Sequence, residues 1–340
     1  MKAIVYETYG TPNVLKCEEV KRPSPAAGQV LLRIRAAGVN PLDAGELKGI
    51  PPIFRVVFGL RKPEAAHPGR PGVDVAGTVE GVGAGVTQFR LGDEVFGVCV
   101  NNPDSGLKVW VHDEGTFAEY ACVPARALAM KPKNIGFEQA ASVPVAALTA
   151  LQGLRDKGHI EAGRKALIHG AGGGVGTFAV QIAKAFGAEV TAVTSTANLG
   201  LVRALGADHT IDYTQTDFTA GRERYDLVLD CHGNHSLSAC RRVLNPRGVY
   251  VVAGGSGETG AFRLLLLLLQ MLVFAKFTAR KTVTLLARPV QKDLATLSEY
   301  IAAGKIVPVV DRCFALNEVP DAMRYLSEGR ARGKVVISVQ

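Results

Sequence analysis

The segment Ala166–Gly187, ALIHGAGGGVGTFAVQIAKAFG, decides the fold of this chain. It opens with a short apolar run that ends at His169, and five of the next seven residues are glycine. The apolar residues that follow are spaced by four, three and four positions, which places them on one face of a helix: Val175, Ala179, Ile182 and Phe186. Lys184 and then Gly187 are typical of a helix end. The segment therefore predicts a strand, a glycine turn and a helix.

This order of elements is the setting that a dinucleotide-binding fingerprint requires. In the i, i+2, i+5 frame the three positions are Ala171, Gly173 and Gly176, an A-x-G-x-x-G variant. The first position, or Gly170 before it, allows the tight turn. Gly173 lets a pyrophosphate approach the backbone, and Gly176 lets the helix pack on the strand. Because the helix N-terminus attracts phosphate charge, we expect the whole turn to bind the cofactor: Gly170, Ala171, Gly172, Gly173, Gly174, Val175 and Gly176.

The turn after the next predicted strand, Val190–Thr194, indicates which nicotinamide cofactor is bound. An NAD site usually presents Asp or Glu there to the ribose hydroxyls, but this turn contains Ser195, Thr196 and Asn198 and no carboxylate. Hydroxyls and an amide can donate hydrogen bonds to a 2′-phosphate, which a carboxylate would repel. NADP(H) is therefore favoured. The turn lacks Arg and Lys, so Arg203 or a basic residue from a distant segment has to supply positive charge.

The pattern of the chain changes after Pro124. Short strand-like runs with glycine and proline between them precede it and predict an antiparallel or barrel-like β domain. Beyond it, a helical run at Phe137–Arg155 leads into strands that alternate with helices, which indicates a parallel sheet with covered faces. The expected strands are Ala166–His169, Val190–Thr194, Asp226–Asp230, Gly248–Ala253 and Thr282–Leu286.

The C-terminal segment alternates in the same way. We expect a helix at Asp293–Ala303, a strand at Val307–Val310, a helix near Asp321–Leu326 and a last strand at Lys334–Val339, which returns to the first domain. The expected domains are residues 1–123 with 288–340, and residues 124–287. The chain is thus expected to be α/β, with a mainly β domain beside a doubly wound parallel sheet.

Composition excludes several classes of protein. The 340 residues include 39 Lys and Arg and 31 Asp and Glu, a net charge of +8 that is spread along the chain without a basic and aromatic stripe for nucleic acid. None of the six cysteines forms a C-x-x-C pair, so a disulfide framework is not expected. The first residues do not resemble a signal peptide, and the expected location is the cytoplasm.

One segment, Leu264–Ala275, is apolar over 12 residues except for Gln270. A membrane span needs about 20 residues, so this segment is too short to cross a bilayer. Three interpretations remain open: a buried or interface helix, an apolar lid over a substrate pocket, and a helix that lies on a membrane surface.

Motifs along nearly the whole chain resemble the medium-chain dehydrogenase/reductase superfamily, in its zinc-free quinone oxidoreductase branch, which includes zeta-crystallin-like proteins. Besides the glycine turn, they are Gly38–Asp43 (GVNPLD), Pro71–Gly77 (PGVDVAG), Gly92–Gly97 (GDEVFG), Ala147–Ala150 (ALTA) and Ala331–Val336 (ARGKVV). The resemblance implies a Rossmann domain with a GroES-like, partly open barrel as the catalytic domain. It also implies a homodimer.

The resemblance implies that the catalytic zinc is absent. Zinc-dependent members carry a cysteine where Asn40 stands and a histidine where Val73 stands, and neither residue here is a usual zinc ligand. A different cluster, Cys231, His232 and His235, is the alternative metal site, although a turn with exposed imidazoles is the favoured interpretation.

For the reaction, the resemblance implies hydride transfer from NADPH to a quinone or an α,β-unsaturated carbonyl. It places Asn40 and Thr149 beside the nicotinamide and substrate. Asp43 is a candidate proton donor or orienting residue. It further implies that the backbone at Gly233, Gly254 and Gly255 contacts the cofactor. Tyr213 is expected near the adenosine, and Arg330 near its phosphate.

Two other functions stay open. One is a zinc-free alcohol or aldehyde reductase. The other is a nucleotide-binding structural or membrane-peripheral protein with little turnover, which the apolar segment Leu264–Ala275 would suit. The single residues also have simpler interpretations. Asn40 before Pro41 can be a turn residue, the Thr149 hydroxyl can bond the preceding helical turn, Tyr213 can be a packing residue, and Arg330 can belong to a solvated charge run.

Overall fold

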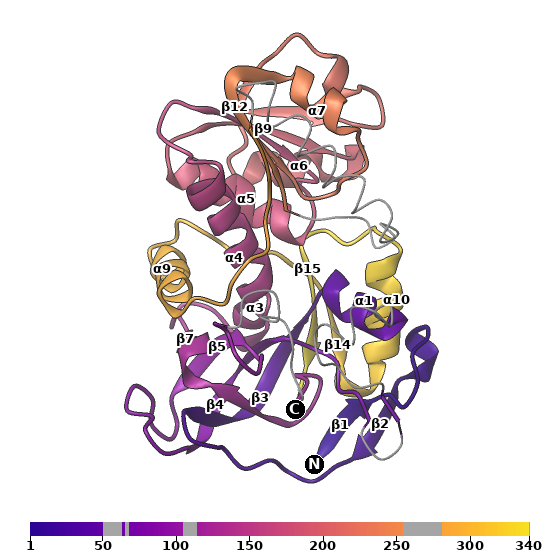
Figure 1. Cartoon of the computed structure of the whole chain (residues 1–340), viewed down its shortest axis with the longest axis vertical. Helices are drawn as coiled ribbons and strands as arrows, with labels where there is room; N and C mark the ends of the chain where they lie inside the picture. The colour runs from indigo at the N-terminus through magenta and orange to yellow at the C-terminus, as the bar shows by residue number, and fades with distance from the viewer. Residues whose placement is uncertain (50–62, 65–67, 105–113, 254–280, 340) are drawn as a thin grey trace. The chain divides into compact units, whose positions relative to one another are not determined.

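The computed structural model describes residues 1–49, 63–64, 68–104, 114–253 and 281–339. The chain divides into two compact units (Figure 1). Unit 1 consists of Met1–Leu148, Arg288–Gly304 and Pro308–Gln340, and unit 2 of Thr149–Ala287 and Lys305–Val307. The domain bounds expected from the sequence, residues 1–123 with 288–340 and residues 124–287, stay a prediction. Gly254, Gly255 and the apolar segment Leu264–Ala275 lie outside the described residues.

Unit 2 is built on a six-stranded sheet in which every neighbouring pair is parallel. The strand order is β10-β9-β8-β11-β12-β13, so the chain runs outward from β8 on one side and from β11 on the other. The carboxyl ends of β8 and β11 therefore flank the switch point, where ligands bind in such sheets. The strands are β8 (Lys165–His169), β9 (Glu189–Thr194), β10 (His209–Asp212), β11 (Tyr225–Asp230), β12 (Leu244–Val252) and β13 (Lys281–Thr284).

Apolar burial explains why these segments are strands. In β8 every residue after Lys165 is buried, and in β11 only Asp226 is partly exposed. Strands covered on both faces are typical of parallel sheets. β10 was not predicted, because its four residues HTID are half-exposed and at the sheet edge, without an apolar run. The helices described between the strands of unit 2 are α5 (Gly174–Ala185), α6 (Leu199–Ala204) and α7 (Leu237–Arg242).

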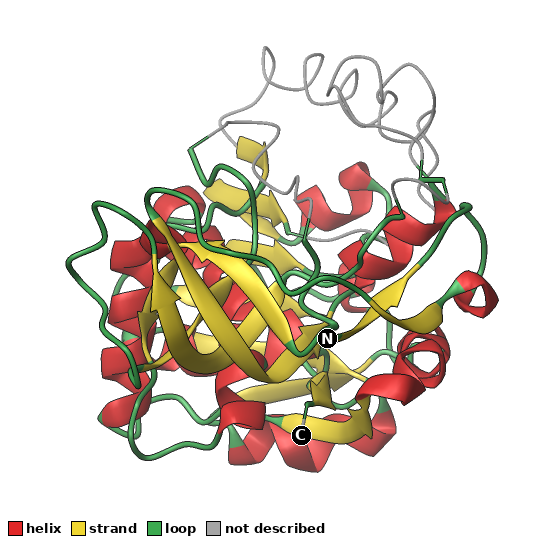
Figure 2. Cartoon of the chain, turned by 90° about the horizontal axis from the view of Figure 1, so that it is seen from below, coloured by secondary structure: helices red, strands yellow, loops and turns green. Residues whose placement is uncertain are grey.

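Unit 1 is mainly β, as predicted. A seven-stranded sheet has the order β14-β15-β3-β4-β5-β7, with β6 paired to β3, and a separate pair joins β1 and β2. Its twisted strands are yellow in Figure 2. The strands are β1 (Lys2–Val5), β2 (Lys16–Glu19), β3 (Gln29–Val39), β4 (Asp74–Val82), β5 (Glu94–Val98), β6 (Tyr120–Pro124), β7 (Leu128–Met130), β14 (Val310–Ala315) and β15 (Lys334–Ser338).

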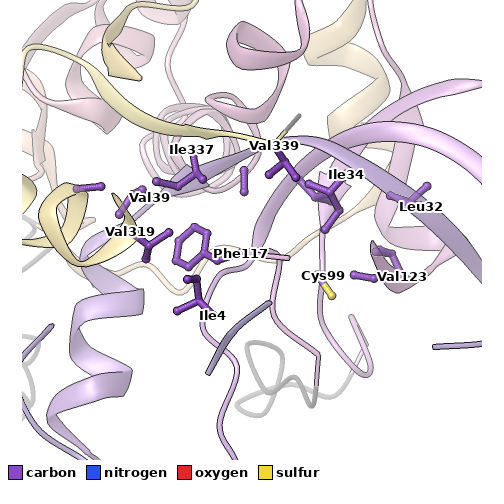
Figure 3. Packing of buried hydrophobic residues seen from close by; sticks show 14 of the residues in the cluster. Ile4, Leu32, Ile34, Val39, Cys99, Phe117, Val123, Val319, Ile337 and Val339 are labelled. Carbon is purple, nitrogen blue, oxygen red and sulfur yellow. The ribbon is translucent and has the colours of Figure 1, made fainter. Parts of the chain in front are cut away.

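The C-terminal strand completes the core of unit 1. β15 pairs antiparallel with β3, and Val336 lies opposite Gly38. Side chains from the two ends of the chain share one apolar core: Figure 3 shows Ile4, Val39 and Phe117 near Val319 and Ile337. The last strand therefore returns to the sheet formed by the first residues.

One helical prediction needs correction, and one helix was not predicted. The single helix expected at Phe137–Arg155 is α3 (Phe137–Ala141), α4 (Pro144–Gln152) and a π-helical turn at Gly153–Lys157, because Pro144 cannot continue a helix. An additional helix, α1 (Pro41–Lys48), begins after Asn40. The others agree with the prediction within a few residues: α9 (Gln291–Ala302) and α10 (Val319–Ser327).

The strand expected at Val307–Val310 is wrong, since β14 begins only at Val310 and carries the polar sequence VDRCFA. Single 3₁₀ turns lie at Pro12–Val14, Ala125–Ala127, Thr196–Asn198, Phe218–Ala220 and Leu316–Glu318. Among the helices that the structure describes, none has the length and apolar character needed to cross a membrane.

Candidate active site

The glycine turn lies between β8 and α5, at the carboxyl end of the central strand. Gly170 has a φ of 80°, in the left-handed region that glycine adopts without strain. The N–H groups of Gly170 and Ala171 both donate to the carbonyl oxygen of Val193, at 3.1 and 3.0 Å. These bonds fix the start of the turn to the end of β9.

Two glycines of the turn are needed for close packing. A Cβ atom at Gly176 would lie 2.2 Å from the Gly170 oxygen and 2.6 Å from the Ala171 Cα. At Gly172 it would lie 2.5 Å from Asn198 Nδ2. All three distances are far below van der Waals contact. A larger residue at Gly176 would push the turn apart, and one at Gly172 would displace the Asn198 side chain.

Gly173 differs from Gly172 and Gly176 because no described atom would lie closer than van der Waals contact to a Cβ at this position. The nearest atom to a Cβ at this position would be the Gly170 oxygen, at 3.5 Å. Gly173 is also the N-cap of α5 and has no side chain to cap the helix. The first N–H groups of a helix have no partner within it, so an anion at Gly173 would meet unused donors and the positive helix end. The turn therefore fits a pyrophosphate.

The corner expected to bind the adenosine ribose holds a carboxylate that the sequence analysis missed. The Thr196 hydroxyl donates to Asp212 Oδ2 at 2.5 Å and lies 3.1 Å from the Thr214 hydroxyl. Hydrogen bonds from Thr196 and Thr214 lower the pKa of Asp212 below its ordinary value. Since Asp212 ends the unpredicted strand β10, no signal in the sequence brought it to this corner. Thr196 therefore uses its hydroxyl within the protein.

The other candidates at this corner differ in their environment. Asn198 Oδ1 is buried and has no hydrogen-bond partner among the described residues. The backbone N–H of Tyr213 donates to Thr194 O at 3.0 Å, and its side chain is 55% exposed. Ser195 is half-buried. The Arg203 guanidinium donates to the Thr210 hydroxyl at 3.0 Å.

A second loop, residues 231–235, follows β11 and lies beside the glycine turn. A Cβ at Gly170 would be 3.6 Å from Cys231 Cβ and 3.7 Å from His232 Cβ. Partial burial and the neighbouring His169 lower the pKa values of His232 and His235, so both imidazoles are neutral at pH 7. Burial raises the pKa of the Cys231 thiol, which stays protonated. Gly233, in this loop, has a φ of 74°.

Unit 1 contains a buried polar cluster around Asn40, the residue before α1. The Lys334 ammonium donates to Asn40 Oδ1 at 2.5 Å and lies 3.2 Å from Asp74 Oδ2. Asn40 Nδ2 donates to the same Asp74 oxygen at 3.0 Å. The backbone N–H of Val145 donates to the other Asp74 oxygen at 2.9 Å. Both ends of the Asn40 amide are therefore held by charged side chains.

These charges are removed from water. Asp74 is completely buried, and Lys334 is 4% exposed. Burial raises the pKa of Asp74, while the Lys334 ammonium and the Asn40 amide oppose this effect. A buried ion is stable only when it is paired and hydrogen-bonded, and both ions of this pair are.

Asp43, in the first turn of α1, is the second expected catalytic residue of unit 1. Its Oδ2 accepts the Asn40 N–H at 2.6 Å, and its Oδ1 is buried without a partner among the described residues. Complete burial raises the pKa of Asp43 to about 8, with a smaller contribution from Glu46. The carboxyl group is therefore protonated at neutral pH.

This burial predicts a pH dependence of stability. Between about pH 4 and pH 8 the unfolded chain has lost the Asp43 proton and the folded chain retains it, so stability falls as pH rises. Asp43→Asn removes this titration. We expect the free energy of unfolding of the wild type to fall relative to that of the variant by about 1 kcal/mol per pH unit in this window. Urea denaturation of both proteins from pH 5 to 8 measures it, and a constant difference would contradict the assignment.

Comparison with known proteins identifies the family. Residues 26–133 match the alcohol dehydrogenase GroES-like domain, and residues 205–337 match the zinc-binding dehydrogenase model. The 2-methylene-furan-3-one reductase of Solanum lycopersicum is 36% identical over 343 residues, covering 99% of this chain and 79% of that protein. The chain belongs to the medium-chain dehydrogenase/reductase superfamily. Its place is in the quinone oxidoreductase branch, and it is an oxidoreductase.

Further relatives agree with this placement. The chloroplastic NADPH-dependent alkenal/one oxidoreductase of Arabidopsis thaliana is 36% identical over 342 residues, with 99% of this chain and 79% of that protein covered. The structure of the quinone oxidoreductase from Coxiella burnetii has a TM-score of 0.84 and 30% identity over 100% of this chain and 99% of that one. The fold expected from the resemblance, a Rossmann domain with a GroES-like domain, is confirmed.

The medium-chain dehydrogenase/reductase fold carries zinc in some members, and the residues here do not suit that ion. The Asn40 oxygen is bound to an ammonium group, and Val73 is buried and apolar. In the described part of the chain, no three His, Cys, Asp or Glu side chains form a group that could hold a metal ion. This includes the alternative cluster of Cys231, His232 and His235.

The structure thus brings together two sets of predicted residues. The glycine turn and Asn198 lie together in unit 2, and Asn40 and Asp43 lie together in unit 1. Thr149, in α4, is buried, and Arg330, before β15, is exposed. The roles proposed for Thr149, Tyr213, Gly233 and Arg330 stay predictions, as do those of Gly254 and Gly255. Lys334 and Asp74 were missed as partners of Asn40, because residues 40, 74 and 334 are far apart in the sequence.

Proposed function

We propose that this medium-chain dehydrogenase/reductase uses NADPH to reduce α,β-unsaturated carbonyls or quinones without a metal ion. The observation that carries the proposal is that, among the described residues, none crowds Gly173 at the N-terminus of α5, which no side chain caps. This turn suits a pyrophosphate, and the relatives that share nearly the whole chain are named as enone and quinone reductases. When bound, NADPH would supply a hydride for the electrophilic carbon of the acceptor.

The residues of the chain would bind and orient the coenzyme and the substrate and would not form covalent bonds with them. The turn from Gly170 to Gly176 would hold the pyrophosphate by backbone N–H groups. Asn40 is buried and its amide is held at both ends by Lys334 and Asp74, so it would fix the start of α1 beside the reacting groups. A protonated Asp43 next to it would be the candidate proton donor of unit 1.

A metal-free reaction is part of the proposal and follows from the kind of acceptor. In an enone the hydride adds to the β-carbon, and negative charge develops on an oxygen that hydrogen-bond donors can stabilise. A conjugated acceptor therefore needs less Lewis-acid help than a simple alcohol or aldehyde. The described residues around Asn40 supply an amide, two carboxyl groups and an ammonium group, but no thiolate or imidazole.

The preference for NADPH over NADH belongs to the proposal as well. The turn from Ser195 to Asn198 contains no carboxylate, which favours a 2′-phosphate. The Asp212 carboxylate next to it accepts hydrogen bonds from two threonine hydroxyls and keeps its negative charge, so a 2′-phosphate would need a basic residue nearby. We expect a preference of about tenfold, with Arg330 as the candidate for the missing positive charge.

The remaining proposals concern the substrate, the oligomeric state and the cellular location of the enzyme. The substrate is a small apolar carbonyl compound or quinone, and the enzyme is a homodimer without nucleic-acid partners. None of the six cysteines forms a disulfide, which suits a reducing compartment such as the cytoplasm. Contact with a membrane surface through Leu264–Ala275 is retained as a proposal from the sequence.

A panel of acceptors tests the proposed function. With NADPH, we expect kcat/KM for enones and quinones to exceed that for saturated aldehydes by at least about tenfold. Incubation with a chelator such as EDTA should leave the rates unchanged. Faster reduction of simple aldehydes would favour the alcohol or aldehyde reductase, and loss of activity that zinc restores would contradict the metal-free mechanism. The absence of turnover with every acceptor would favour a binding protein.

A further inference from the structure

One buried carboxylate, that of Asp230, reaches both loops of the coenzyme site. Asp230 is the last residue of β11 and is fully buried. Its Oδ1 accepts three hydrogen bonds, from His169 Nδ1 at 2.9 Å, from the backbone N–H of His232 at 2.9 Å and from that of Gly233 at 2.8 Å. Its Oδ2 accepts the hydroxyl of Tyr250 at 2.5 Å. Four donors thus converge on a residue outside the glycine turn.

The hydrogen bond between His169 and Asp230 fixes the residue that precedes the glycine turn. His169 ends β8, immediately before Gly170, and its ring is only 3% exposed. The ring packs on Phe218 with 5.0 Å between centroids. Since an ionised carboxylate only accepts hydrogen bonds, His169 Nδ1 must carry the proton. Asp230 therefore fixes both the orientation and the tautomer of the residue from which the turn starts.

The two hydrogen bonds from backbone N–H groups to Asp230 fix the second loop, residues 231–235. The N–H groups of His232 and Gly233 point to one oxygen atom and hold the chain in a tight turn, with Gly233 in the left-handed region. The His232 and His235 rings meet the His169 ring edge-on, with centroids 5.8 and 5.2 Å away. A displacement of Asp230 would therefore move both loops together.

The charge of Asp230 makes these bonds strong. Burial alone would raise the pKa of this carboxyl, but hydrogen bonds from His169, Tyr250 and Gly233 hold it well below its ordinary value. Hydrogen bonds to a charged acceptor are about twice as strong as neutral ones. A fully satisfied buried group of this kind rigidifies its surroundings.

We propose that Asp230 is a positioning residue for the coenzyme, because it holds the glycine turn and the 231–235 loop in a single arrangement. The inference rests on the proposed function, since it assumes that NADPH is bound between these loops. It assigns Asp230 no contact with the coenzyme. Its effect is to keep the pyrophosphate donors in place before binding, so that binding does not have to order them.

A series of four variants tests this role. Asp230→Ala removes all the bonds and should raise the Kd for NADPH by about 10- to 100-fold. Asp230→Asn retains an acceptor at the Oδ1 position and should restore the Kd to within about fivefold of the wild type. His169→Phe retains the ring packing and removes one bond to the turn, with an expected increase of about threefold to tenfold. Tyr250→Phe is the matched control, because it removes a bond to the same carboxylate that does not involve either loop, and it should leave the Kd unchanged.

The Kd is measured by NADPH fluorescence titration, together with KM for NADPH, kcat at saturation and Tm. The proposal expects KM to follow the Kd across the series while kcat stays within about threefold of the wild type. An unchanged Kd in Asp230→Ala, or the same increase in Tyr250→Phe as in His169→Phe, would overturn it. If Asp230→Ala does not fold, the comparison of His169→Phe with Tyr250→Phe decides. Failure of the wild type itself to bind NADPH would instead contradict the proposed function.

Discussion

Replacing Gly173 by aspartate is expected to raise the Kd for NADPH by about 1,000-fold, which would abolish binding at practical concentrations. Among the described residues, the nearest atom to the new Cβ would be the Gly170 oxygen at 3.5 Å, an ordinary contact distance, so the turn can fold around it. Its carboxylate would occupy the place proposed for the pyrophosphate. Two like charges about 4 Å apart near a protein surface repel each other by about 4 kcal/mol, which corresponds to about three orders of magnitude in affinity.

Two control variants separate charge from folding. Gly173→Ala adds bulk without charge and should weaken binding much less than aspartate does. Gly136→Asp makes the same substitution at the N-cap of another helix, α3, where an aspartate is favourable, and it should leave the Kd unchanged. NADPH fluorescence titration and thermal denaturation of each variant measure the effects. Tight binding of NADPH by a folded Gly173→Asp variant would contradict the location of the site.

The second large effect is expected at Lys334. Lys334→Met preserves most of the side-chain volume but leaves the Asp74 carboxylate buried without its counter-ion, which is 3.2 Å away in the wild type. Removing one partner of a buried ion pair typically costs about 3–5 kcal/mol. We therefore expect the free energy of unfolding to fall by this amount, as measured by urea denaturation at pH 7.

The double variant Lys334→Met, Asp74→Asn distinguishes the buried charge from lost packing. An asparagine at position 74 can still accept the Val145 N–H but carries no charge, so the double variant should recover at least about 2 kcal/mol. Lys16→Met, in the exposed pair with Glu7, is the surface control and should change stability by at most about 1 kcal/mol. Equal losses in the single and double variants would contradict the buried pair.

The sequence was most informative where one local pattern determines one structure. The segment Ala166–Gly187 combines an apolar strand, a glycine turn and an amphipathic helix, and all three are present as β8, the turn and α5. Strands at sheet edges were harder to predict. β10 and β14 are half-exposed and polar, so their sequences HTID and VDRCFA resemble loops. Only pairing with a neighbouring strand makes them strands.

In the candidate site, too, local patterns were predictable and contacts between distant residues were not. The role of the glycine turn follows from adjacent residues, and the structure agrees in detail: Gly176 is needed for packing, and Gly173 leaves space. Lys334 follows Arg330 and Arg332 in the sequence, and such a run of positive charges is usually solvated. In the structure β15 turns its side chain inward to Asp74, a partner 260 residues away in sequence. Such long-range pairing leaves no local signal.

Asp230 was hidden for a different reason. At the end of a predicted strand its carboxylate looked like the first polar residue of a loop, and the sequence drew attention to Cys231, His232 and His235 behind it. The carboxylate points inward because four donors from β8, β12 and its own loop are arranged around it. The sequence thus indicated where the site lies and left open which buried groups hold it in place.

The most direct test of the proposed reaction follows the hydride itself. The wild-type enzyme is incubated with an enone and with NADPH that carries deuterium at both positions of nicotinamide C4, and the product is examined by NMR. We expect one deuterium atom at the β-carbon of a saturated ketone and a proton from solvent at the α-carbon. Deuterium at the former carbonyl carbon of an allylic alcohol, or none in any product, would contradict the account.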